Sequence, residues 1–124
     1  MEMQVLRESF SVCKVTDYTQ VNLEDEYCFT GKTDEENSLV CITEHVPRNT
    51  IEREDGWRAF RIAGTLDFAL VGILSKIAGL LAEHRISIFA VSTYNTDYVF
   101  LKEDKFNEAI AVLEENGYGI LWTA

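Results

Sequence analysis

The chain has 124 residues, 47% of them apolar and 26% charged, enough for one compact domain or two very small domains packed together. Its formal net charge of −10 repels phosphate backbones and anionic lipids, which argues against nucleic acids and membrane surfaces as partners. The N-terminus lacks the basic and then apolar layout of a signal peptide, and the apolar stretch 68–82 is too short to span a bilayer. We therefore expect a cytoplasmic protein.

The first half of the chain contains strand-like segments and only weak helical signal. Strands rich in β-branched and aromatic residues are expected over 5–15, 27–30 and 38–43. A charged hairpin connection joins the last two, and the helical signal is confined to 18–25 and 47–54. We interpret residues 1–56 as a shortened copy of the fold of the second half, or as an extra sheet layer.

The second half, residues 57–124, has the order strand, helix, strand, strand, helix, strand. Apolar residues between 70 and 83 recur with a helical period, and a second amphipathic helix begins near Asp104 and ends at Asn116. Alternating or β-branched runs predict strands over 57–64, 86–93, 98–101 and 118–122. This order predicts a ferredoxin-like α+β fold, in which two βαβ halves interleave and both helices cover one face of an antiparallel sheet.

The residue types that carry catalysis or bind metals are scattered. Three cysteines occur without a Cys-x-x-Cys spacing, and His45 and His84 are isolated from each other and from a nucleophile. Cys13, Cys28 and Cys41 each fall inside or beside a predicted strand, where cysteine is usually a small core residue. We therefore expect free thiols, no metal, no cofactor and no enzymatic activity.

Two motifs in the second half resemble the ACT domain family. Gly72-Ile73-Leu74 is similar to its Gly-Ile/Val helix start, and the segment 92–98, Ser-Thr-Tyr-Asn-Thr-Asp-Tyr, is similar to its Ser-Thr-Tyr/Phe-x-x-Asp turn. The similarity runs from about residue 57 to 113, and the segment 29–40 resembles a hairpin of the same group. That group comprises the tandem ACT proteins, which include small bacterial members and the animal cytosolic arginine sensors.

The resemblance implies a tandem ACT fold that binds a free amino acid and performs no chemistry. Residues 1–56 would form an ACT-like half and residues 57–124 the ACT domain. The ligand would lie at an ACT–ACT boundary. Because a sheet edge of this fold usually finds a partner, we also expect a homodimer.

The predicted ligand site is centred on Gly72. The unsatisfied amides of a helix N-terminus can hold the ligand's carboxylate, and a glycine lets the ligand approach the backbone. Asp97 would accept the ligand's ammonium group, while Thr93 and Tyr94 would add hydroxyl contacts and an aromatic wall. The complete predicted set is Leu70, Val71, Gly72, Ile73, Leu74, Thr93, Tyr94 and Asp97.

Each of these residues also has a purely structural interpretation. Gly72 can serve a tight turn, Asp97 can bind its own turn backbone, and Thr93 and Tyr94 can be ordinary strand residues. Two other functional classes are a ligand-free dimerisation module with an ACT fold, and an RNA binder, since RNA-recognition domains share the βαββαβ order. The net charge of −10 argues against the RNA binder.

Ligand preference is suggested by one departure from the arginine sensors. Those proteins carry an acid two residues before the glycine, where this chain has Leu70. A guanidinium buried there would lack one of its anions, which is costly. The apolar Leu70, Val71 and Leu74 instead suit a neutral amino acid.

Overall fold

The computed structural model describes residues 1–63 and 72–123 and divides the chain into two compact units. Unit 1 consists of Met1–Arg7 and Arg58–Ala124, and unit 2 of Glu8–Trp57. Two long strands, β1 (Glu2–Val15) and β4 (Thr50–Ile62), therefore contribute one part to each unit. The predicted division of the chain between residues 56 and 57 stays a prediction.

Unit 1 contains the second half of β4 followed by two helices and three further strands. These elements are α1 (Ile73–Glu83), β5 (Ile88–Ser92), β6 (Asp97–Lys102), α2 (Glu103–Glu115) and β7 (Gly119–Trp122). The strand order is β5-β6-β4-β1-β7, with β5 and β6 antiparallel and β7 parallel to the start of β1. The predicted βαββαβ order is confirmed, and the start of β1 is an additional strand next to β7.

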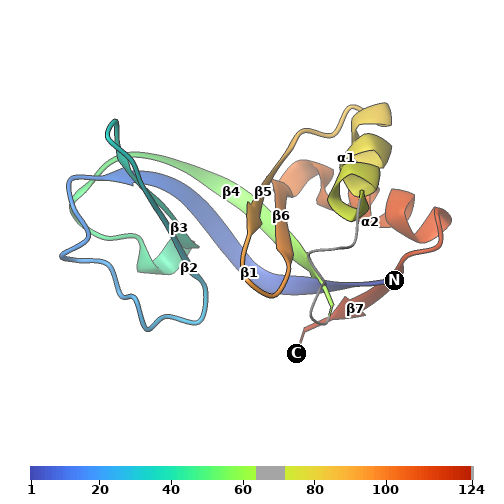
Figure 1. Ribbon diagram of the computed structural model, residues 1–124, viewed down its shortest axis with the longest axis horizontal. Coiled ribbons are helices and arrows are strands. Elements are labelled where there is room, and N and C mark those ends of the chain that lie inside the picture. The colour runs from blue at the N-terminus through green and yellow to red at the C-terminus, as the bar shows by residue number, and fades with distance from the viewer. Residues whose placement is uncertain (64–71, 124) are drawn as a thin grey trace. The chain divides into compact units, whose positions relative to one another are not determined.

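Both helices cover the same side of the strands of unit 1 (Figure 1). Alternate residues of each strand face them, so β1, β4 and β6 each supply a pair of buried side chains to one core. The strand contributions are Met3 and Val5, Phe60 and Ile62, and Val99 and Leu101; the helices add Ile77, Leu81, Phe106, Ala109, Ile110, Val112 and Leu113. Burying each large apolar side chain contributes about 1.5–3 kcal/mol. The ferredoxin-like fold follows from this shared face.

Both helices end in the same hydrogen-bonded motif. After α2, Gly117 has a φ of 89°, and the Tyr118 amide donates to the Leu113 carbonyl at 3.1 Å. After α1, Arg85 takes the equivalent place with a φ of 59°, and the Ile86 amide donates to the Leu81 carbonyl at 3.0 Å. This arrangement satisfies the last helical carbonyls and places an apolar residue back against the helix. It fixes Tyr118 at the end of α2.

Unit 2 is built of strands and one short 3-10 helix. The hairpin β2 (Cys28–Lys32) and β3 (Asn37–Ile42) pairs with the second half of β1, and η1 (Thr43–His45) follows it. Residues 8–57, all described, contain no α-helix, so the weak helical signals at 18–25 and 47–54 do not correspond to helices. The small core of unit 2 is formed by Cys13, Val15, Leu39 and Cys41.

The hairpin of unit 2 repeats the hairpin of unit 1. β2 and β5 each have 5 residues, β3 and β6 each have 6, and the connections are 33–36 and 93–96. In both connections the first residue is a threonine whose amide donates to the fourth residue's carbonyl, at 3.0 Å from Thr33 and 2.8 Å from Thr93. The repeat supports the tandem interpretation, with η1 standing where α2 follows β6 and with no counterpart of α1.

Candidate functional site

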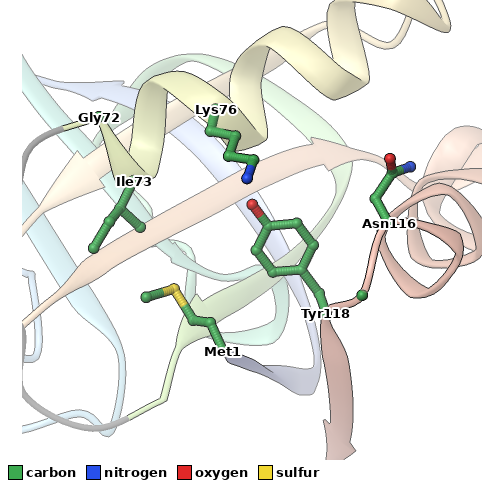
Figure 2. A pocket seen from close by; sticks show the side chains of 7 residues that line it. Met1, Gly72, Ile73, Lys76, Asn116 and Tyr118 are labelled. Atoms are coloured by element: carbon green, nitrogen blue, oxygen red, sulfur yellow. The ribbon is translucent and has the colours of Figure 1, made fainter.

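A cavity of about 330 Å³ opens at the start of α1 in unit 1 (Figure 2). One wall is the beginning of α1 and the other is the segment that joins α2 to β7. Its lining residues are Met1, Gly72, Ile73, Lys76, Asn116, Gly117 and Tyr118. The volume lies at the low end of the range of about 300–1,000 Å³ found for small-molecule sites.

Gly72 is the first residue of this wall and has an unusual backbone. Its φ of 81° and ψ of 5° are left-handed, a conformation that costs other residues roughly 1–2 kcal/mol. Beyond its chain neighbours, no described residue has an atom within 4 Å of a Cβ placed on Gly72, so the described surroundings leave space beside its backbone. The backbone geometry alone requires glycine here, and the open space is what makes the position available to a ligand.

The cavity brings together the first turn of α1, an ammonium group, a hydroxyl and an amide side chain. The first intrahelical hydrogen bond of α1 runs from the Lys76 amide to the Gly72 carbonyl at 2.8 Å, so the amides before it lack helical acceptors. The Lys76 ammonium and the Tyr118 hydroxyl point toward each other across the cavity (Figure 2). Asn116 is held by its Nδ2, which donates to the Val112 carbonyl at 2.8 Å. A positive charge beside the start of a helix suits a carboxylate.

The predicted site residues are divided among several places. Gly72 and Ile73 line the cavity at α1, while Leu74 is partly buried against the core of unit 1. Leu70 and Val71 lie outside the described residues. Thr93 and Tyr94, by contrast, belong to the β5–β6 connection, and Asp97 is the first residue of β6. None of the three is among the described residues that line this cavity.

The β5–β6 connection borders a second cavity of about 300 Å³. Its lining residues are Gln4, Arg61, Ile62, Thr93, Asn95, Thr96 and Tyr98. Thr96 is 7% exposed, and its hydroxyl donates to the Ile62 carbonyl at 2.9 Å, which ties the connection to the end of β4. Asp97 accepts a hydrogen bond from the Ser92 hydroxyl at 2.5 Å, and Tyr94 is 83% exposed.

Several lining residues were not predicted from the sequence. Lys76 follows Gly72 by one helical turn, and this spacing is the signal that could have indicated it. Tyr118 comes from a distant segment, without any local pattern that relates it to Gly72. Arg61 alternates with the buried Phe60 and Ile62, which could have marked it as a charged residue on the opposite face of the strand.

Among the described residues, the titratable groups with an assigned pKa shift lie in unit 2. The hydrogen bond between Cys13 and Cys41 raises the pKa of Cys41 and lowers that of Cys13, and burial raises the pKa of Cys28. The residues described by the structure contain no group of three or more acids, histidines or cysteines arranged to hold a metal ion. Within the same described ranges, no helix is long and apolar enough to cross a membrane.

Unit 1 is thus a ferredoxin-like α+β domain whose cavities are of a size that suits small molecules. A family model described as "ACT domain" matches residues 52–115, more than half of the chain, and the protein belongs to this family. It is 40% identical over 65 residues to the human cytosolic arginine sensor for mTORC1 subunit 1. That match covers 52% of this chain and 20% of the relative, so the chain corresponds to about a fifth of the curated relatives' length.

Solved structures share the fold at low sequence identity. A protein from Agrobacterium tumefaciens superimposes with a TM-score of 0.87 at 21% identity, covering 99% of this chain and 93% of the other. The ligand-free regulatory subunit of aspartate kinase from Thermus thermophilus gives a TM-score of 0.62 at 6% identity, over 93% and 96% of the two chains. At these identities the likeness concerns the fold alone.

Proposed function

We propose that this protein is an amino-acid-binding regulatory module without catalytic activity, and that its ligand lies beside Gly72. The observation that carries the proposal is the cavity at the start of α1, where the backbone of Gly72, the first turn of a helix and a lysine meet in an ACT domain. The arginine sensor to which the chain is similar and the regulatory subunit with the same fold support a regulatory role.

The ligand's carboxylate would be held by the first amides of α1 and by the Lys76 ammonium. Hydrogen bonds to charged groups contribute about 1.5–3 kcal/mol each, which is enough to orient a small molecule. Since Tyr118 and Asn116 lie at the end of α2, a ligand in this cavity would connect the start of one helix to the end of the other. It would thereby stabilise the folded state by RT ln(1 + [L]/Kd), and that stabilisation is the regulatory signal.

The ligand's ammonium group would be bound at an ACT–ACT boundary. Thr93, Tyr94 and Asp97 line no wall of the Gly72 cavity among the described residues, so a second ACT unit is the proposed source of these contacts. The 83% exposure of Tyr94 leaves it available to such a neighbour. We accordingly propose a homodimer in which the β5–β6 connection of one copy meets the cavity of the other.

A neutral amino acid is the proposed ligand, with arginine and lysine bound less tightly. Lys76 adds a positive charge to the described cavity wall, which disfavours a cationic side chain there. Leu70 supplies no acid at the position where the arginine sensors have one. The cytosol is the proposed location, because three cysteines without a disulfide framework suit a reducing compartment.

Thermal melting against the twenty amino acids, combined with light scattering, tests this function. A neutral amino acid should raise the melting temperature in proportion to ln(1 + [L]/Kd), and the molar mass should be that of a dimer. A dimer whose melting temperature responds to no amino acid would instead support the ligand-free dimerisation module. A monomeric mass with and without ligand would contradict the ACT–ACT boundary site.

A further inference from the structure

We propose that the cavity around Arg61 is a second ligand site of unit 1 and that it takes a small carboxylate. It is separate from the cavity at Gly72, because no described residue lines both. Phe60 and Ile62 belong to the helix-covered core, and successive side chains of a strand point to opposite faces. Arg61 therefore lies on the face of the sheet away from α1 and α2, and it takes no part in the contacts proposed for the Gly72 site.

The guanidinium of Arg61 is held in place before any ligand binds. Its Nε donates to Gln4 Oε1 at 2.8 Å, and one terminal nitrogen donates to the Tyr98 hydroxyl at 2.9 Å. The guanidinium carbon lies 5.7 Å from the centre of the Tyr98 ring, within the range of a cation–π contact. These contacts use two of the five N–H donors, so the remaining donors of the fork are positioned without further loss of side-chain freedom.

Arg61 is a charge without a counterion in the described part of the chain. The described residues form no ion pair with it, although the chain has 21 acids and 11 basic residues. In such an acidic chain a basic side chain easily finds a carboxylate on the surface, whereas Arg61 is partly buried beside a cavity lined by amides and hydroxyls. A bound anion would supply an opposite charge that the described residues do not.

The composition of the wall selects a carboxylate. Ile62 is the one apolar residue in the described lining, and Asn95 adds an amide at the rim. The hydroxyls of Thr93 and Thr96 already donate to the carbonyls of Thr96 and Ile62, so they shape the wall. A planar guanidinium fork matches a carboxylate through two parallel hydrogen bonds. With one basic residue in the described lining, a singly charged carboxylate is compensated, whereas a dianionic phosphate is not.

Amide NMR titrations of the full chain test this site, with acetate and inorganic phosphate as separate probes. Acetate should shift the amides of the 93–98 segment in a saturable way and phosphate should bind there more weakly. Arg61→Gln should weaken acetate binding by about tenfold or more, since charged hydrogen bonds are lost, while Arg61→Lys should be intermediate because it keeps the charge without the fork. The matched control is Lys105→Gln, which removes a positive charge at a 49% exposed position on α2 and should leave acetate binding unchanged.

A second variant keeps the test decisive if Arg61→Gln does not fold. Tyr98→Phe retains the ring beneath the guanidinium and removes only the hydroxyl that positions it, so acetate binding should weaken while the fold is kept. Four results would overturn the proposal: no saturable acetate shift, unchanged affinity in Arg61→Gln, equal loss in Lys105→Gln, or tighter binding of phosphate at the same amides. The amino-acid site at Gly72 is tested separately, with amino acids in the melting screen and with Gly72→Val.

Discussion

Replacing Thr96 by valine should destabilise the protein through a single buried hydrogen bond. Thr96 is 7% exposed and its hydroxyl donates to the Ile62 carbonyl at 2.9 Å. Valine has nearly the same shape, so the change removes the donor and leaves that carbonyl buried without it. The expected loss is about 1–3 kcal/mol of the free energy of unfolding, equivalent to roughly 4 °C in melting temperature per kcal/mol.

Urea denaturation measures this loss, with Thr96→Ser as the matched control. Serine keeps the hydroxyl and should retain most of the stability, whereas Thr96→Val should lower the midpoint with an unchanged slope. The same variant should broaden or shift the amide signals of 93–97, because that connection loses its link to β4. A loss below about 0.5 kcal/mol, within the range of ordinary surface substitutions, would refute the anchoring role of Thr96.

Three smaller predictions concern a helix end, a thiol and an acid. Arg85→Gly should raise the free energy of unfolding by up to about 1 kcal/mol, measured in urea, because Arg85 holds a left-handed φ of 59° that glycine adopts without strain. Cys28 is partly exposed and should be alkylated before the two buried cysteines; burial raises its pKa, so its rate at neutral pH should lie below that of a free thiol and increase with pH. Hydrogen bonds from the Thr19 hydroxyl and amide lower the pKa of Asp17, so its contribution to stability is present above its unfolded pKa and is lost as pH falls through the lower folded pKa. Asp17→Asn should flatten that part of the acid unfolding curve.

Local sequence patterns were sufficient to predict the second half of the fold. Predicted helices over 70–83 and from Asp104 to Asn116 correspond to α1 and α2, because each has an apolar stripe of helical period that packs on one sheet face. The four strands of this half were also located, since their periodicity and flanking turns are encoded within a few residues.

Strand pairing and strand length were less accessible. The parallel pairing of β1 with β7 joins the two ends of the chain, and no local pattern specifies a partner so distant in sequence. β4 begins at Thr50, although its first residues are charged and exposed and resemble a solvated helix more than a strand. This segment is a strand because it pairs with other strands, and that pairing exists only in the folded chain.

In the candidate sites too, residues marked by a local sequence motif were predicted, and residues brought in by tertiary packing were not. Gly72 was identified because the segment Gly72-Ile73-Leu74 resembles the helix start of the ACT family, and the left-handed φ explains why this position must be glycine. Tyr118 and Arg61 were missed, since their proximity to Gly72 and to Thr93 depends on tertiary packing. The turn motif led to the prediction that Asp97 binds the ligand's ammonium group. In the structure the Asp97 carboxylate accepts a hydrogen bond from Ser92, and its contact with the ligand remains a proposal for the dimer.

Calorimetric titration of Gly72→Val beside Gly56→Val tests the amino-acid site most directly. The two glycines have φ values of 81° and 86°, and beyond its chain neighbours a Cβ atom on either would meet no described atom within 4 Å, so valine should strain both backbones similarly. Of these two glycines, Gly72 lines the cavity at α1 and Gly56 is not among its described lining residues. At a temperature where both variants are folded, Gly56→Val should bind the neutral amino acid found in the melting screen as wild type does, and Gly72→Val should lose about tenfold or more, a difference of about 1.4 kcal/mol. Equal affinity of the two variants would contradict the site.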